Sequence, residues 1–229
     1  MYNLDPLNIL KIITTGITAV IALIIGLRVL FLNKKDLLNR WFAVYFISSS
    51  IGFILYVIYH LILNNSGVII PLMITAHIFF NFNSISLTMT LFVLEKHTKI
   101  AMSMKYLGTM LIIFFVMSIG YFIFPPYLDM DDYTLGIVNT HTPPGLFIFV
   151  NTIRILLALY AAYKYIIINR KIAGETKNRI KWFLLGVIIF VFGLLINLTG
   201  GLLSIIVIEI LALITFAIGA LLVLNGFLI

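Results

Sequence analysis

Long apolar segments, separated by short polar stretches, follow one another from Leu7 to the end of the chain. A helix needs about 20 apolar residues to cross the hydrocarbon core of a bilayer. Seven segments come close to or exceed that length, at approximately residues 7–32, 40–63, 68–94, 105–124, 145–168, 181–198 and 202–229. The pattern therefore predicts an all-α fold, with one seven-helix transmembrane domain over residues 1–229.

The composition supports a membrane protein and argues against a soluble one. Hydrophobic residues make up 62% of the 229 positions and charged residues only 10%, whereas a soluble domain has about 25% charged residues. The apolar runs also lack the alternation that is typical of a membrane β-barrel. Since the chain has no cysteine, disulfides, thiolate metal sites and cysteine nucleophiles are excluded.

The basic residues are distributed unevenly. The chain has 15 lysines and arginines and a net charge of +7, and nearly all of these residues flank the first, third and fifth connections between apolar segments. Lys11 and Arg154 are the exceptions. Because basic residues gather in cytoplasmic loops, we expect an outside N-terminus, a cytoplasmic C-terminus and a multi-pass protein of the cell membrane. The positive charge then reflects topology, and we expect no nucleic acid partner.

The longest connection, an extracellular loop over residues 125–144, is acidic. Asp129, Asp131 and Asp132 lie in it, and strand-forming residues surround a glycine at residues 133–138, which predicts a short hairpin. The uneven spacing of the aspartates does not match a calcium-binding loop. We expect a solvated acidic loop, with cation binding as the alternative.

Arg154 lies inside an apolar segment, where a charge is costly. A guanidinium near the middle of a bilayer costs at least ~2.5–3.5 kcal/mol, and it does not escape by losing its proton. Glu209 is the only acidic residue inside another apolar segment. At ~1.5 Å of rise per residue, Glu209 lies ~10 Å and Arg154 ~13 Å from the outer surface. We therefore expect Arg154 to pair with Glu209 or to be reached by water.

Other polar residues lie at a similar depth. His77, Asn81, Ser84 and Thr88 share one face of the third segment, and such a face should turn towards the bundle interior. The predicted ligand-binding residues are Arg154, Glu209, His77, Asn81, Asn151, Tyr56 and His60. The alternative is structural, because polar side chains commonly hydrogen-bond between membrane helices, for about 0.6 kcal/mol each.

Several chemistries are not favoured. Paired axial histidines should stand at one level, but His60 lies ~5 Å and His77 ~13 Å below the outer surface, which argues against haem. No zinc motif or Ser/His/Asp grouping is present. Retinal needs a Schiff-base lysine, and the seventh segment has none. We expect no catalytic residues, no metal, no cofactor and no enzyme activity.

Four stretches carry a resemblance to a known family. They are the loop Tyr133–Pro144 before the fifth segment, the basic pair Arg170-Lys171, the start of the sixth segment Lys177–Gly186 (KNRIKWFLLG), and the end of the third, Leu91–Lys96. In this pattern the chain resembles the seven-helix membrane sensor region at the N-terminus of many bacterial and archaeal histidine kinases. The resemblance implies a sensor without fixed catalytic residues that signals to a cytoplasmic output domain. The chain stops at Ile229, so we expect either an isolated membrane module or an output that comes from a separate partner.

The favoured interpretation is a sensory, receptor-like module. It would bind a small, anionic ligand in a polar pocket in the outer half of the bilayer and signal to a cytoplasmic partner. One alternative is a transporter or ion-translocating protein, although no inverted repeat is evident. The other is an accessory membrane subunit that binds no small ligand, in which a pair between Arg154 and Glu209 would be structural.

Overall fold

The computed structural model describes residues 5–228 and, within them, every side chain except those of His97, Glu175, Thr176 and Leu228. Seven helices in this range are long and apolar enough to cross a membrane. They are α1 (Pro6–Leu32), α2 (Leu37–Leu61), α3 (Ile69–Ala101), α4 (Thr109–Ile123), α6 (Pro144–Lys171), α7 (Glu175–Leu203) and α8 (Ile206–Leu228). The predicted all-α bundle of seven membrane-spanning helices is confirmed.

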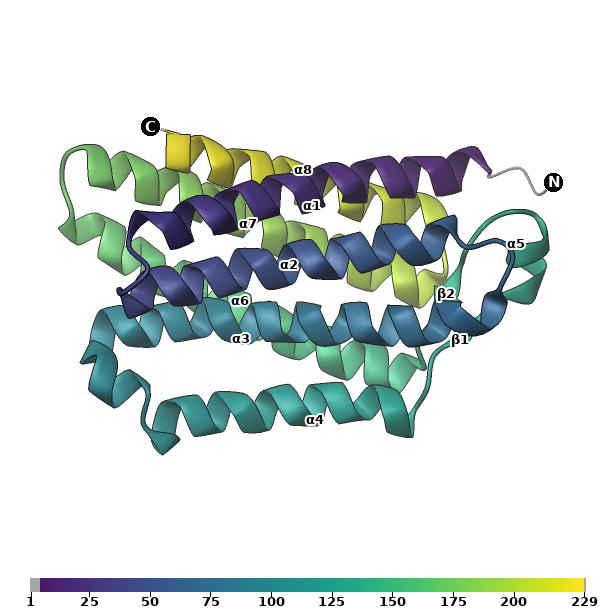
Figure 1. Ribbon diagram of the computed structural model, residues 1–229, viewed down its shortest axis with the longest axis horizontal. Coiled ribbons are helices and arrows are strands. Elements are labelled where there is room, and N and C mark those ends of the chain that lie inside the picture. Colours follow the sequence, from purple (N-terminus) through teal and green to yellow (C-terminus); the bar gives the residue numbers. More distant parts are fainter. Residues whose placement is uncertain (1–4, 229) are drawn as a thin grey trace.

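Six of the helices form a closed ring. Neighbouring pairs pack in the order α1, α2, α3, α6, α7, α8, and α8 packs back against α1. Helix α4 lies outside this ring, against α3 and α6, and Figure 1 shows it at the edge of the bundle. The ring decides which polar residues can meet, because α6 and α8 are separated by α7.

The two ends of the bundle differ. The N-terminal end of α1 and the connection between α4 and α6 lie at one end, which we call the pocket end, and the C-terminus lies at the other (Figure 1). The basic connections after α1, α3 and α6 share the end with the C-terminus, which we call the basic end. Large apolar side chains such as Ile112 and Phe31 are 65% and 63% exposed, as expected for a surface in contact with lipid.

The connection between α4 and α6 differs from the predicted hairpin. Residues 130–134 form a short helix, α5 (Met130–Thr134), and the strands β1 (Tyr127–Leu128) and β2 (Thr140–His141) pair on either side of it. A short antiparallel strand pair is present in this loop as predicted, but its strands lie outside residues 133–138, which begin in α5 and continue as a turn and irregular backbone. Asp129 accepts hydrogen bonds from the N–H groups of Asp131 and Asp132, and such a cap starts a helix.

Helix α7 also continues past its expected end. The sixth predicted segment ended at residue 198, but the helix extends to Leu203 and ends where Ser204 adopts the left-handed conformation, with φ of 54°. Gly201 allows a close approach inside the helix, because an added Cβ would lie 2.4 Å from Cζ of Phe147. Gly200 in turn faces Ile208 and Glu209, so the two glycines serve packing of α7 against α8 and α6 respectively.

Candidate functional site

Arg154 of α6 is anchored to α3. Its Nε and Nη2 both donate to Oδ1 of Asn81, at 3.0 and 2.7 Å, and Nη2 also donates to the backbone oxygen of His77 at 3.1 Å. The side-chain nitrogen of Asn81 donates to Oγ of Ser118 on α4 at 3.2 Å. That hydrogen bond fixes the orientation of the amide, so that its oxygen faces the guanidinium.

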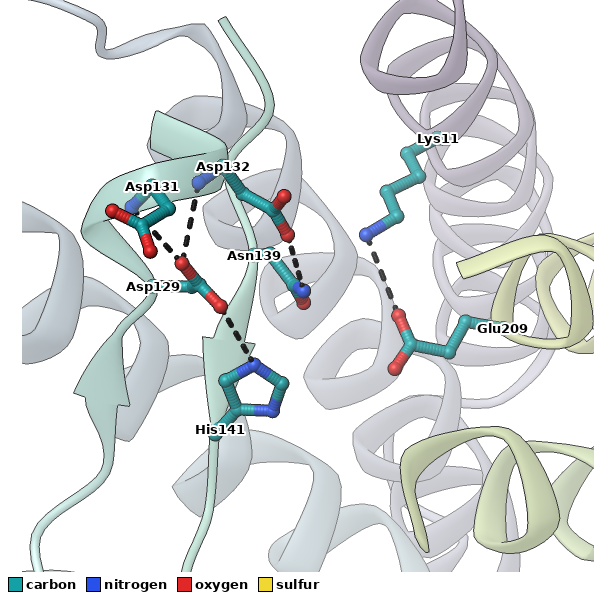
Figure 2. A network of polar contacts seen from close by, with 7 residues as sticks. All are labelled: Lys11, Asp129, Asp131, Asp132, Asn139, His141 and Glu209. Atoms are coloured by element: carbon teal, nitrogen blue, oxygen red, sulfur yellow. Dashed lines mark hydrogen bonds and ion pairs between the residues drawn. The ribbon is translucent and has the colours of Figure 1, made fainter. Parts of the chain in front are cut away.

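The expected pair between Arg154 and Glu209 is not formed. Oε2 of Glu209 lies 3.4 Å from Nζ of Lys11, whose side chain is only 2% exposed (Figure 2). Helices α1 and α8 are neighbours in the ring, whereas α6 packs against α3 and α7. Glu209 is thus neutralised by Lys11, which was not among the predicted site residues.

The role of Lys11 was missed because the residue lies close to the N-terminus. A signal for it exists, since Asn8, Lys11, Thr14, Thr15 and Thr18 are all buried on α1. These residues recur at helical spacing, and a polar face in a membrane helix points to the bundle interior. This polar face predicts that Lys11 lies inside the bundle.

No carboxylate within the described part of the chain pairs with Arg154. Its hydrogen-bond acceptors, Oδ1 of Asn81 and the backbone oxygen of His77, are neutral, and the side chain is buried. The ring of His77 stacks on Tyr121 with centroids 5.0 Å apart, which adds polarisable but uncharged surroundings. The site around Arg154 therefore keeps a net positive charge.

Two adjoining chambers lie inside the pocket end. The mouth chamber, of about 100 Å³, is lined by polar residues that include Lys11, Glu209, His60 and Thr140 of β2. The deep chamber, of about 90 Å³, is lined by Arg154 together with apolar and aromatic side chains, and by Asn83 and Ser84. The residues that line both chambers are Tyr56, His77 and Asn197.

The structure brings most of the predicted site residues to these chambers. Glu209 and His60 line the mouth chamber, Arg154 the deep chamber, and Tyr56 and His77 both of them. Asn81 takes part through its hydrogen bonds to the guanidinium.

Asn151 lines neither chamber. Its nitrogen donates to the backbone oxygen of Phe147, and its buried Oδ1 has no hydrogen-bond partner among the described residues. Asn197 lies at the end of the sixth predicted segment and lines both chambers, but it was not predicted as a site residue.

The imidazole of His60 is held in place by its neighbours. Its Nδ1 lies 2.9 Å from the backbone oxygen of Tyr56, and the two rings stack with centroids 4.0 Å apart. The side-chain nitrogen of Asn8 donates to the backbone oxygen of His60 at 2.8 Å. These contacts orient the aromatic wall between the two chambers.

The acidic loop next to the mouth chamber is braced by its own side chains. Asp132 accepts a hydrogen bond from Asn139 at 2.8 Å, and Oδ2 of Asp129 lies 3.5 Å from Nε2 of His141 (Figure 2). The backbone N–H of Asp132 lowers the pKa of Asp129, with smaller contributions from the N–H of Asp131 and from His141. In the described range no group of three His, Cys, Asp or Glu residues could hold a metal ion. The aspartates cap and brace the loop that covers the mouth chamber.

Helices α3 and α6 are joined by polar contacts at three levels. Arg154 and Asn81 form the first, near the pocket end. The hydroxyl groups of Thr90 and Tyr165 form the second, at 2.8 Å. Nζ of Lys164 and Oε1 of Glu95 form the third, also at 2.8 Å, near the basic end. A change at the deep chamber is thus connected through one helix pair to the far end of the bundle.

The fold and the composition define a multi-pass membrane protein whose interior holds a two-chambered, positively charged site. No protein-family model, no curated protein and no solved structure matches the chain.

Proposed function

We propose that this protein is a sensory module of the cell membrane. It binds a small organic anion at Arg154 and passes the signal to a cytoplasmic partner. One observation carries the proposal: a buried guanidinium lines a chamber and has no carboxylate partner in the described chain. An unpaired charge in a membrane interior is costly, so an anion that pairs with it gains much of its binding free energy there.

The walls of the deep chamber support an anion with an apolar body. Phe53, Phe80, Phe190 and Phe216 surround the space beside Arg154. An apolar cavity of ~150 Å³ admits benzene, and each of the two chambers is smaller than that. A carboxylate with a short alkyl chain or a single ring, seated across both chambers, fits the volume and the chemistry better than a hydrated inorganic ion.

We propose that the pocket end faces outward, because the basic residues gather at the opposite end. A ligand carboxylate would compete with the Asn81 oxygen for the N–H groups of Arg154. This competition changes the first of the three contacts between α3 and α6, and the rearrangement reaches the third, between Lys164 and Glu95. Such a response requires a ligand with different affinities for the two helix arrangements. The resemblance to the membrane sensor region of histidine kinases supports the signalling part of this proposal.

Direct binding tests the proposal. Purified protein in lipid nanodiscs is titrated with acetate, butyrate, benzoate, phosphate and sulfate, and binding is followed by calorimetry. We expect one or more of the organic anions to bind, and Arg154→Gln to weaken that binding roughly tenfold or more, as for the loss of a charge-assisted hydrogen bond. Arg28→Gln is the matched control, because Arg28 lies on an exposed face of α1. Unchanged affinity in Arg154→Gln would overturn the assignment of the site.

A transporter is the competing function. The residues between the deep chamber and the basic end argue against it, because they are mainly apolar. The next space towards the basic end, about 30 Å³, is lined mainly by apolar residues such as Phe46, Val187 and Val223. A continuous path for ions would need polar groups there. Uptake of a bound anion into proteoliposomes would favour transport over sensing.

A further inference from the structure

A second cleft lies between α3 and α6, at the basic end of the bundle. Its volume is about 460 Å³, and Lys96, Lys164 and Lys171 line it together with Glu95. The remaining lining residues are apolar, namely Leu94, Ile167 and Ile168. The cleft is remote from both chambers, and an inference about it does not depend on the proposed function.

The charges of the cleft do not cancel. Glu95 pairs with Lys164 at 2.8 Å, whereas Lys96 and Lys171 are exposed and form no ion pair with any carboxylate of the described chain. The cleft therefore carries a net positive charge from two lysines that come from two different helices. Each lysine near an anionic membrane surface contributes about 1 kcal/mol of attraction.

The cleft also lies at the level of a lipid headgroup. On α3 the apolar run Leu91–Leu94 is followed by Glu95 and then Lys96, and on α6 the run 166–168 ends shortly before Lys171. Both lysines thus mark the boundary at which the helices leave the hydrocarbon core. The apolar residues of the cleft lie on the membrane side of that boundary, where an acyl chain would pass. Leu94, with 43% of its surface exposed, is open to such contact.

We propose that this cleft is a binding site for an anionic phospholipid. The phosphate headgroup lies between Lys96 and Lys171, and an acyl chain runs along Ile167 and Leu94. The combination distinguishes the site from a bare basic surface, because the charges stand at the mouth of an apolar groove. Glu95 of α3 and Lys164 of α6 pair in the same cleft, so the bound lipid would bridge α3 and α6 beside this ion pair.

The test is a lipid competition read by native mass spectrometry. Purified protein in detergent is mixed with equal amounts of phosphatidylglycerol and phosphatidylcholine, and the ratio of the two bound lipids is measured. We expect the wild type to prefer phosphatidylglycerol. The double variant Lys96→Gln/Lys171→Gln should reduce that ratio roughly tenfold or more, from two lysine contributions. Lys34→Gln/Lys35→Gln is the matched control, because this exposed pair lies at the same end outside the cleft, and its ratio should stay near that of the wild type.

A charge-retaining variant and a competition with inorganic phosphate complete the experiment. The charge-retaining variant Lys96→Arg/Lys171→Arg should keep the preference, and Lys171→Gln alone, compared with Lys35→Gln, serves if the double variant does not fold. Excess inorganic phosphate should displace little lipid, since it lacks the acyl chain. An unchanged ratio in the Lys96 and Lys171 variants, an equal loss in the control pair, or full displacement by inorganic phosphate would each overturn the proposal.

Discussion

A single oxygen of Asn81 accepts two hydrogen bonds from the guanidinium of Arg154, at 3.0 Å from Nε and 2.7 Å from Nη2. A neutral amide therefore stands where a carboxylate would stand in a buried ion pair. It satisfies the donors of Arg154 without cancelling their charge. The positive potential of the deep chamber follows from this choice of partner.

Replacing Asn81 should separate hydrogen bonding from charge. Asn81→Leu leaves buried charged donors unsatisfied, and we expect the free energy of unfolding to fall by about 3 kcal/mol. Asn81→Asp should keep at least the stability of the wild type, because the carboxylate neutralises Arg154, but weaken the binding of organic anions by about tenfold or more. Thermal unfolding and calorimetry in nanodiscs measure the two effects. Undiminished anion binding in Asn81→Asp would contradict the role given to the charge.

The pair between Lys11 and Glu209 should be stabilising only as a pair. Glu209→Gln leaves the ammonium of Lys11 buried and unpaired, and we expect a loss of about 2–3 kcal/mol, below the 3–5 kcal/mol of a fully buried pair. The lower figure reflects the 21% exposure of the Glu209 side chain. Lys11→Met/Glu209→Gln should recover most of the loss.

The pair between Lys164 and Glu95 is the control for that experiment. Its side chains are 25% and 23% exposed, and removing one partner should cost less than about 1 kcal/mol. Equal losses at the two sites, measured by thermal unfolding, would show that burial does not set the cost of the Lys11 pair.

The loop over the mouth chamber should loosen in acid. Hydrogen bonds from the N–H groups of Asp132 and Asp131, and the contact with His141, hold the pKa of Asp129 below its usual value. A lowered pKa in the folded state contributes stability above the unfolded pKa of about 3.9, and this contribution is lost as the pH falls through the folded pKa. Limited proteolysis of the loop with an acid-active protease measures the change. The pH is lowered from about 5, above the unfolded pKa, to about 2, so that it falls towards the lower folded pKa.

Asp129→Asn should remove that dependence and leave the loop more susceptible already at neutral pH. Asp131→Asn is the matched control, because the side chain of Asp131 accepts no hydrogen bond in the described structure, and it should behave as the wild type. A control that loses protection to the same extent would refute the capping role of Asp129.

The contact between Gly201 and Phe147 predicts a packing defect. Gly201→Ala would place a methyl group 2.4 Å from Cζ of Phe147, and such overpacking costs about 1–3 kcal/mol. Gly145→Ala should be neutral or slightly stabilising, because nothing lies within 4 Å of an added Cβ there. Thermal unfolding compares the two variants, and Phe147→Leu should rescue Gly201→Ala if the ring is the obstacle.

The number and approximate position of the membrane helices could be predicted from the sequence, because an apolar run of sufficient length has one stable form in a bilayer. The order of helices around the ring could not, since a polar face shows that a helix turns towards the interior but does not show which helices are its neighbours. Arg154 was therefore given the wrong partner. Glu209 lies at a similar depth in the membrane, but its helix, α8, does not neighbour α6 in the ring. The burial of Lys11 was also missed. The residue lies close to the N-terminus, and the polar face of its helix was not taken into account.

The wall shared by the two chambers has a kinetic consequence. Tyr56, His77 and Asn197 come from three helices, α2, α3 and α7, and the ring of Tyr56 is stacked on His60. A molecule that travels from the mouth chamber to Arg154 passes these side chains, and we expect them to rotate as it passes. Association should then be slower than diffusion allows and saturate at high concentration. The same rotation would limit dissociation, so the side chain of Tyr56 would help to set the residence time of the bound molecule.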